Sequence, residues 1–170
     1  MPTWTAPRTW ATDELVTAAL LNTHLRDNLD ALKSPPSASY LSTADVQTLT
    51  SNSWANLDAN FALTITPSGT QVMAGINLIA KQTAANNGIF YVDIQSDDGT
   101  TQTAFAGSDG FAQAHCDNAT PTQIKTLSGV VLISGLTAAT QYTFRVRYKV
   151  ATADDFDVLT GSSFWVREVS

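Results

Sequence analysis

The residues of this chain that could act as a nucleophile, a general base or a metal ligand are few. Its only histidines are His24 and His115, and its only cysteine, Cys116, directly follows His115. Neighbouring residues of a regular strand point to opposite faces, so His115 and Cys116 cannot form a catalytic dyad there. His115, Cys116 and Asp117 likewise cannot all face one metal ion. The sequence therefore predicts an inert thiol, no catalytic residue, no metal site and no cofactor.

Carboxylates gather in two places, which are Asp93, Asp97 and Asp98, and Asp154, Asp155 and Asp157. Either group could offer oxygen ligands to a hard cation. Either could also supply the acid pair of a glycoside hydrolase, which needs two carboxylates roughly 5 to 10 Å apart. We interpret both groups as solvated acids of turns, so the chain is not expected to be an enzyme, and polysaccharide hydrolysis is the less favoured alternative.

Three cations, Arg145, Arg147 and Lys149, alternate along one predicted strand and share its polar face. They could bind an anionic partner, but the formal net charge of -6 favours pairing with acids across strands or subunits. The other cations are scattered and form no phosphate-binding stripe, so no nucleic-acid partner is expected.

Aromatic side chains in or near predicted loops could stack on sugar rings. The candidates are Tyr40, Trp54, Phe111 and Phe156. Buried packing is the commoner role of such rings, because exposed rings in a β-rich chain promote aggregation. Binding of a host receptor or glycan is therefore an alternative function.

These side chains need a scaffold, and the N-terminal part of it is predicted to be a helix. Thr12 is a suitable N-cap, Asp13 and Glu14 suit the first turn, and Lys33 suits the last, before Ser34-Pro35-Pro36. The helix contains a heptad pattern with Leu15, Asn22 and Leu29 at one core position and Ala18, Leu25 and Leu32 at the other. We expect these six residues to mediate oligomerisation; in the alternative, the helix lies on its own sandwich, because Leu20 and Leu21 widen the apolar stripe.

After residue 38 the apolar pattern changes from a helical period to a period of two. Strands are predicted at 61–66, 72–81, 89–94, 100–106, 125–134, 142–150 and 163–169, with Gly129 as a possible bulge. The clearest is 142–150, where every even-numbered residue is apolar. The prediction is a mainly β protein, with residues 1–38 as an anchoring segment and oligomerising helix and residues 39–170 as an antiparallel β-sandwich of jelly-roll type.

Composition agrees with a structural role. The 170 residues are 44% hydrophobic but only 14% charged, a balance that suits contacts between subunits. The first residues do not form a secretion signal, and no run of about 18 apolar residues could span a bilayer, so membrane insertion is not expected.

The N-terminal residues resemble the start of many virion proteins of tailed phages and prophages. The shared pattern is W-x-x-x-E-x-V-T-A-x-x-L-N-x-x-x-R-D-N, here from Trp10 to Asn28. The rest resembles their C-terminal β-domains in layout, with Ser53-Trp54, Thr64-Ile-Thr-Pro67-Ser, Thr140-Gln-Tyr142-Thr-Phe and Phe164-Trp-Val-Arg-Glu168.

This resemblance implies a homotrimer whose knob is similar in outline to the tumour-necrosis-factor fold. It implies a virion location after synthesis in the host cytoplasm, and attachment to other virion proteins through the N-terminal segment, where Trp4 and Trp10 are the expected anchors. Only residues 34–41 separate helix from sandwich, whereas tail fibres usually have a long shaft. A tail fibre, a short tail tip and a capsid decoration protein all remain open.

Overall fold

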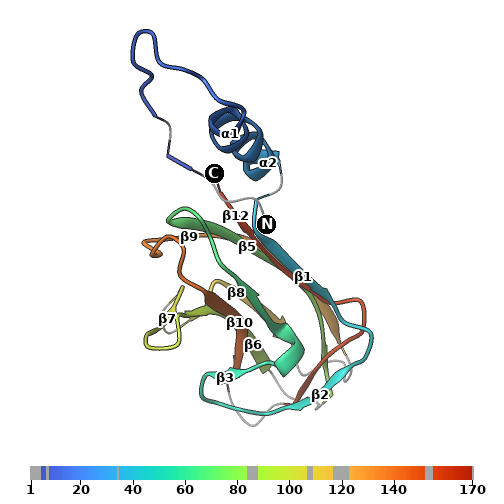
Figure 1. Ribbon diagram of the computed structural model, residues 1–170. Helices are drawn as coiled ribbons and strands as arrows, with labels where there is room; N and C mark the ends of the chain where they lie inside the picture. The colour runs from blue at the N-terminus through green and yellow to red at the C-terminus, as the bar shows by residue number, and fades with distance from the viewer. Residues whose placement is uncertain are drawn as a thin grey trace.

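The computed structural model describes residues 5–6, 8–33, 35–83, 88–106, 109–116, 123–151 and 155–169, without the side chains of 31–33. Within them, a helical segment leads into two antiparallel six-stranded sheets that pack face to face (Figure 1). The predicted mainly β, antiparallel sandwich with an N-terminal helix is confirmed. No helix among these residues is long and apolar enough to cross a bilayer.

The first sheet is built around β5 (Gln71–Gln82), which is paired along both edges. On one edge β9 (Ile124–Ser134) pairs with it without a break. On the other edge lie β12 (Ser163–Glu168) and β11 (Phe156–Val158). Beyond them, β1 (Ser37–Leu41) pairs with β12, and β2 (Val46–Leu49) pairs with β11.

The second sheet is built around β6 (Gly88–Asp97) and β10 (Tyr142–Val150), which pair from Thr143 opposite Asp97 to Val150 opposite Phe90. The outer edge of β10 pairs with β4 (Ala62–Ile65) and β3 (Ala55–Asn56). The outer edge of β6 pairs with β7 (Gln102–Ala104) and β8 (Ala112–Cys116). A single 3-10 turn, η2 (Ala59–Phe61), precedes β4.

The core lies between the two sheets and is rich in phenylalanine. Alternate residues of β10 are buried along its whole length, as the period of two predicts. Phe61, Phe90, Phe144, Phe156 and Phe164 are fully buried. The ring of Phe90, from the second sheet, lies 5.2 Å from that of Phe156, from the first. Each such ring removes a large apolar area from water, so these contacts hold the two sheets together.

The helix begins later than the sequence pattern predicts. It comprises α1 (Ala18–Leu21), a π-helical turn η1 (Asn22–Arg26) and α2 (Asp27–Lys33), and its N-cap is Thr17, whose hydroxyl accepts a hydrogen bond from the Leu20 amide. The prediction of Thr12 as N-cap is wrong. Asp13 adopts a left-handed backbone conformation with φ of 62°, which a helix cannot include.

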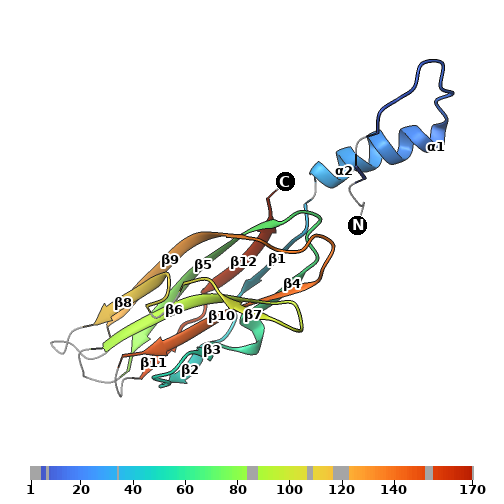
Figure 2. The ribbon, with the colours of Figure 1, turned by 90° about the vertical axis from the view of Figure 1, so that its left-hand side faces the viewer.

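The segment before the helix folds back along it. The Asn28 side chain accepts a hydrogen bond from the Thr5 amide at 2.8 Å and donates one to the Thr5 carbonyl at 2.9 Å. The Trp10 ring meets the His24 ring edge-on. The helix itself projects from one end of the sandwich and lies on neither sheet, unlike the alternative considered from the sequence (Figure 2).

Two further expectations differ from the structure. Gly129 is not a bulge, because β9 pairs with β5 in continuous register through it. Its missing side chain instead admits the ring of Phe111, which would lie 2.7 Å from a Cβ at this position. The first strand begins at Ser37, two residues before the predicted start of the sandwich.

Candidate functional site

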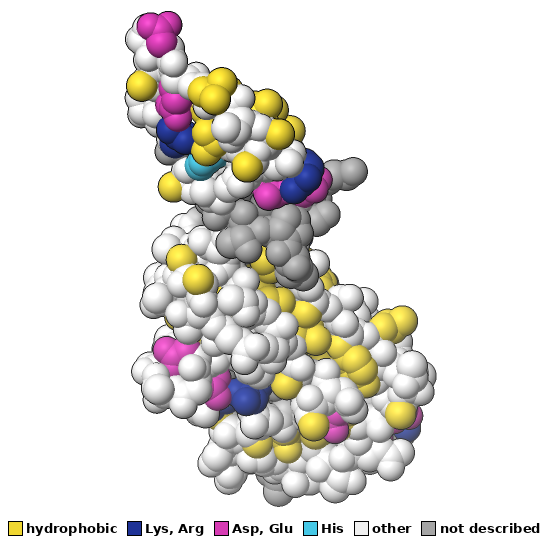
Figure 3. All heavy atoms as spheres, in the orientation of Figure 1, with side chains coloured by type: hydrophobic (Ala, Val, Ile, Leu, Met, Phe, Trp, Pro, Cys, Tyr) yellow, Lys and Arg dark blue, Asp and Glu magenta, His cyan; other side chains and the backbone are white. Residues whose placement is uncertain are grey.

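One candidate surface is the apolar stripe of the helix. Leu21, Leu25 and Leu29, spaced four residues apart, are each about half exposed or more. Hydrophobic side chains gather on this segment in the space-filling view (Figure 3). Such a stripe without a partner marks an interaction surface.

The predicted heptad is only partly on this stripe. Leu15 lies before the helix, because the helix starts at Ala18. Ala18 and Asn22 are exposed on the helix. Asn28, rather than Asn22, is the buried asparagine. The side chain of Leu32 and the whole of Trp4 lie outside the described residues, and Trp10 is partly exposed beside His24.

The outer face of the first sheet is a second apolar surface. Leu132 and Val130 of β9 are 49% and 56% exposed, Met73 of β5 is 38% exposed, and Leu41 of β1 is 62% exposed. Gly75 of β5 pairs with Val130 of β9 on one side and with Trp165 of β12 on the other. The Trp165 ring lies across Gly75, and a Cβ at this position would be 2.4 Å from the ring.

Charge is sparse on this face. The outward residues of β1, β5, β9 and β12 are Ser37, Ser39, Leu41, Gln71, Met73, Gly75, Asn77, Ile79, Lys81, Ile124, Thr126, Ser128, Val130, Leu132, Ser134, Ser163, Trp165 and Arg167. Two of them, Lys81 and Arg167, are cations and none is a carboxylate, while β11 of the same sheet adds Asp157 opposite Lys81. A sheet face of apolar and small hydroxyl side chains is costly to leave in water and inexpensive to desolvate.

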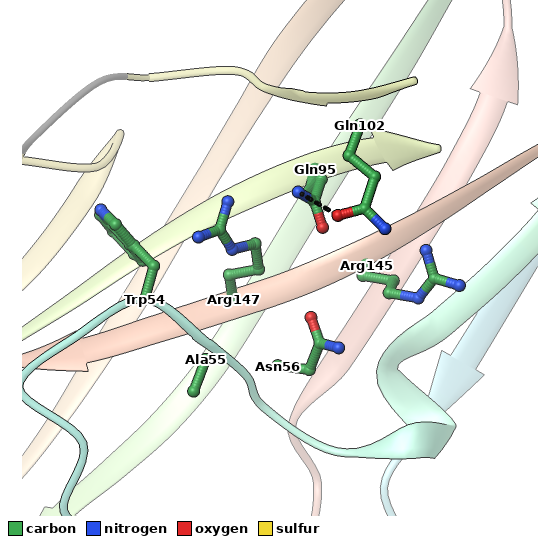
Figure 4. Close-up of a pocket in the computed structure, with 7 residues that line it drawn as sticks. All are labelled: Trp54, Ala55, Asn56, Gln95, Gln102, Arg145 and Arg147. Atoms are coloured by element: carbon green, nitrogen blue, oxygen red, sulfur yellow. Dashed lines mark hydrogen bonds between the residues drawn. The ribbon is translucent and has the colours of Figure 1, made fainter. Parts of the chain in front are cut away.

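The outer face of the second sheet has the opposite character and contains a polar groove of about 390 Å³. The segment that ends in β3 contributes Trp54 just before the strand and Ala55 and Asn56 within it, β6 contributes Gln95, β7 contributes Gln102, and β10 contributes Arg145 and Arg147 (Figure 4). The segment is held against β10 by hydrogen bonds from the Leu57 amide to the Val146 carbonyl and from the Val150 amide to the Ser51 carbonyl. These bonds position Trp54 over the strand that carries the cations.

One end of the groove is fixed by an ion pair. The Arg145 guanidinium donates to Asp97 at 2.6 Å, and the Gln102 amide donates to the same carboxylate at 3.2 Å. Gln95 donates in turn to the Gln102 side-chain oxygen at 3.3 Å. The Gly99 amide and the Arg145 side chain lower the pKa of Asp97, so this carboxylate stays charged at neutral pH.

The other end combines cations and aromatic rings. The Arg147 guanidinium lies 5.5 Å from the centre of the Trp54 ring, and the Lys149 ammonium lies 5.2 Å from it and 4.7 Å from that of Tyr91. These distances allow cation–π attraction.

Asp93 lies opposite Arg147 in the register of β6 and β10 and is 1% exposed. One carboxylate oxygen accepts a hydrogen bond from the Ala106 amide at 2.9 Å, while the other has no partner among the described residues. Burial raises the pKa of Asp93, although the Ala106 amide and, more weakly, Arg147 act in the other direction.

Of the four aromatic residues predicted to face a ligand, Trp54 alone lines the groove. Phe156 is fully buried, so its prediction is wrong; it alternates with Asp157 on β11 and points into the core. Tyr40 is half-buried and packs edge-on against Phe61 at 5.0 Å. Phe111 is half-buried between Phe105 and the surface of Gly129.

The remaining reactive residues show no convergence. His115 is exposed and Cys116 is buried, on opposite faces of β8, as the alternation predicts. Asp98 accepts hydrogen bonds from the Thr100 and Thr101 amides within its turn, and Asp157 accepts one from the Thr48 amide. Within the described part of the chain, no three His, Cys, Asp or Glu residues are placed to hold a metal ion.

Sequence reasoning missed four groove residues, Ala55, Asn56, Gln95 and Gln102. Gln95 and Gln102 lie on strands flanking a turn, and the alternation of β6 places Gln95 on the same face as Asp97. The position of Gln95 could therefore have been predicted from the sequence. The pairing of β3 with β10, which adds Asn56 and Trp54, has no signature in a two-residue strand.

No protein-family model matches the chain, and no curated protein matches it. Among solved structures, Eiger TNF from S. frugiperda is 8% identical, with 81% of this chain and 94% of that chain covered at a TM-score of 0.54. A pentameric capsid protein from metagenomic phage sequences is 12% identical, with 95% and 80% covered at a TM-score of 0.29. A chain in the structure of infectious bursal disease virus, Gt strain, is 18% identical, with 78% of this chain and 40% of that chain covered at a TM-score of 0.32. The last two superpose too poorly to carry an argument. The first shows the fold alone, and it confirms the predicted sandwich of jelly-roll type.

Proposed function

We propose that this protein is a non-catalytic structural component of a phage virion, which assembles as a homotrimer and displays its β-sandwich. The N-terminal pattern from Trp10 to Asn28 motivates the virion assignment. In this proposal the segment with Trp4 and Trp10 contacts other virion proteins, and the role is that of a fibre, tail-tip or capsid decoration protein.

The observation that carries the assembly is that two unpartnered apolar surfaces meet along one chain. The exposed leucines of the helix lead directly into β1, which is part of the first sheet with its outer face of Val130, Leu132 and Met73. Copies joined at the helices would lie with these sheet faces near one another. Burying both surfaces together removes more apolar area from water than burying either alone.

Light scattering of the full chain at several concentrations tests this assembly. We expect a trimer, and we expect the double substitution Leu25→Asp and Leu29→Asp to yield monomers or a much weaker trimer, because it buries charge at the contact. Thr23→Asp, exposed on the same helix, is the matched control and should leave the trimer unchanged. A monomeric or dimeric wild-type protein would refute the homotrimer.

The sheet face is tested separately. Leu132→Glu should weaken the assembly, whereas Thr126→Glu, on the same outward side of β9 and three alternating positions away, should weaken it less. Equal assembly of wild type and Leu132→Glu would show that the sheet face is not part of the contact.

A second candidate function is binding of a host receptor or glycan by the displayed sandwich. The groove on the second sheet favours it, because it combines one tryptophan with amide and guanidinium side chains. Its described lining lacks the carboxylate pair that glycoside hydrolysis uses, which supports binding rather than hydrolysis.

A further inference from the structure

We propose that the groove on the second sheet binds a carboxylate-bearing sugar, such as a uronic acid unit of an acidic polysaccharide. The proposal rests on the second candidate function and specifies its ligand. It is independent of the trimer, because the groove and the apolar face lie on different sheets.

The charge of the groove is opposite to that of the whole protein. Three of the nine Lys and Arg residues of the chain stand together on β10, as Arg145, Arg147 and Lys149, although the net charge is -6. Asp97 neutralises Arg145 at one end, and no carboxylate is among the described residues that line the groove itself. An anionic group is therefore attracted to this place on a protein that otherwise repels it.

Arg147 is the residue best placed to bind the carboxylate. Arg145 is already engaged by Asp97, whereas Arg147 forms no ion pair among the described residues. Its cross-strand neighbour Asp93 is on the same face of the sheet, but it is 1% exposed, accepts a hydrogen bond from the Ala106 amide and is not among the residues that line the groove. A guanidinium presents two parallel N–H donors, which match the two oxygens of a carboxylate.

The neutral groups of the groove suit the rest of a sugar. Asn56, Gln95 and Gln102 each carry a donor and an acceptor for hydroxyl groups. Gln95 and Gln102 are held by each other and by Asp97, so they lose little freedom on binding. The Trp54 side chain is half-buried beside Arg147 and offers an apolar surface to the C–H groups of a ring.

Other anions fit this lining less well. Three amide side chains and two guanidinium groups line the groove, a ratio that suits a sugar with several hydroxyl groups for each carboxylate better than a compact phosphate ion. A volume of about 390 Å³ is at the small end of ligand sites, which suits a short stretch of a saccharide chain.

Titration calorimetry with the full chain tests the proposal, using oligogalacturonate and its methyl ester as probes. The two probes share a sugar backbone and differ in charge, so we expect oligogalacturonate to bind and the ester to bind at least about tenfold more weakly. Arg147→Gln should reduce the affinity for oligogalacturonate by a similar factor. Arg167→Gln, on the outer face of the first sheet, is the control and should bind like wild type.

Each other outcome overturns a distinct part. Equal binding of the ester would remove the acidic specificity but leave glycan binding standing. Binding of neither probe would overturn the proposed ligand, while the oligomeric state would still report on the virion role. Equal binding of polyglutamate would show that charge alone is recognised. Thermal unfolding of Arg147→Gln at the wild-type temperature excludes misfolding, and Trp54→Leu, which keeps the charges, should also weaken binding if the sugar ring contacts the indole.

Discussion

The outer face of the first sheet depends on a close contact between Gly75 and the ring of Trp165. Gly75 has no Cβ, and the ring of Trp165 occupies the space that a Cβ would need. We expect Gly75→Ala to destabilise the protein by about 1–3 kcal/mol, the usual cost of forcing extra atoms into a packed site. Urea denaturation measures it. The double substitution with Trp165→Leu should recover part of the loss, and an additive loss would show that the clash is not the cause.

The buried carboxyl group of Asp93 should make the stability of the protein depend on pH. Because its pKa is raised in the folded state, that state binds the proton more readily than the unfolded chain does. The free energy of unfolding contributed by Asp93 therefore falls as the pH rises from the ordinary aspartate pKa through the raised one. Asp93→Asn removes this effect, so the stability of the variant relative to wild type should increase as the pH rises above the ordinary aspartate pKa of about 3.9.

Asp98 is the matched control for this experiment, because hydrogen bonds, chiefly from the Thr101 amide, lower its pKa. A lowered pKa contributes stability above the unfolded pKa that is lost as the pH falls. Asp98→Asn should thus lose stability relative to wild type as the pH rises, the opposite trend. The same trend for both variants in denaturation curves would contradict these assignments.

At the scale of elements, the start of the helix separates what the sequence predicts from what the structure shows. Thr17→Ala should weaken the first turn by about 1 kcal/mol, because the Leu20 amide loses its acceptor. Thr12→Ala, which removes the cap expected from the sequence, should have no such effect. Hydrogen exchange of the amides of α1 measures the difference, and equal protection in both variants would contradict it.

The strands that could be predicted are those whose alternation extends over many residues. β5, β6, β9 and β10 follow from it, because one face of each is buried and the other is not. β3 and β11 have two and three residues and gain their place only from pairing with long partners. A short segment carries too few residues to display a period.

The same limit applies to the groove. Sequence placed Arg145, Arg147 and Lys149 on one face correctly, since they alternate on β10. It could not bring Trp54 to them, because that contact joins residues about ninety positions apart through a two-residue strand. The sequence also could not show that Asp13 lies before the helix and not in its first turn, because this depends on a left-handed backbone conformation.

At the scale of the whole molecule, assembly should be linked to stability. If the apolar stripe and sheet face are buried only between copies, mass action favours the folded assembly at higher concentration. We expect the midpoint of thermal unfolding to rise over a tenfold increase in concentration. The double substitution Leu25→Asp and Leu29→Asp should abolish the rise in scanning calorimetry. A midpoint independent of concentration in wild type would show that the contact adds no stability.

The connection between helix and sandwich also sets how the protein would bear tension. β1 follows the helix, and its five residues pair antiparallel with β12 from Ser37 opposite Arg167 to Leu41 opposite Ser163. The helix projects roughly along the strand direction (Figure 2). A pull between a held helix and a sandwich attached elsewhere therefore loads these hydrogen bonds in shear, so that they share the force instead of opening one after another like a zipper. A joint of this geometry resists sudden loading better than its short length implies, and the same five pairs pulled sideways would peel apart at low force.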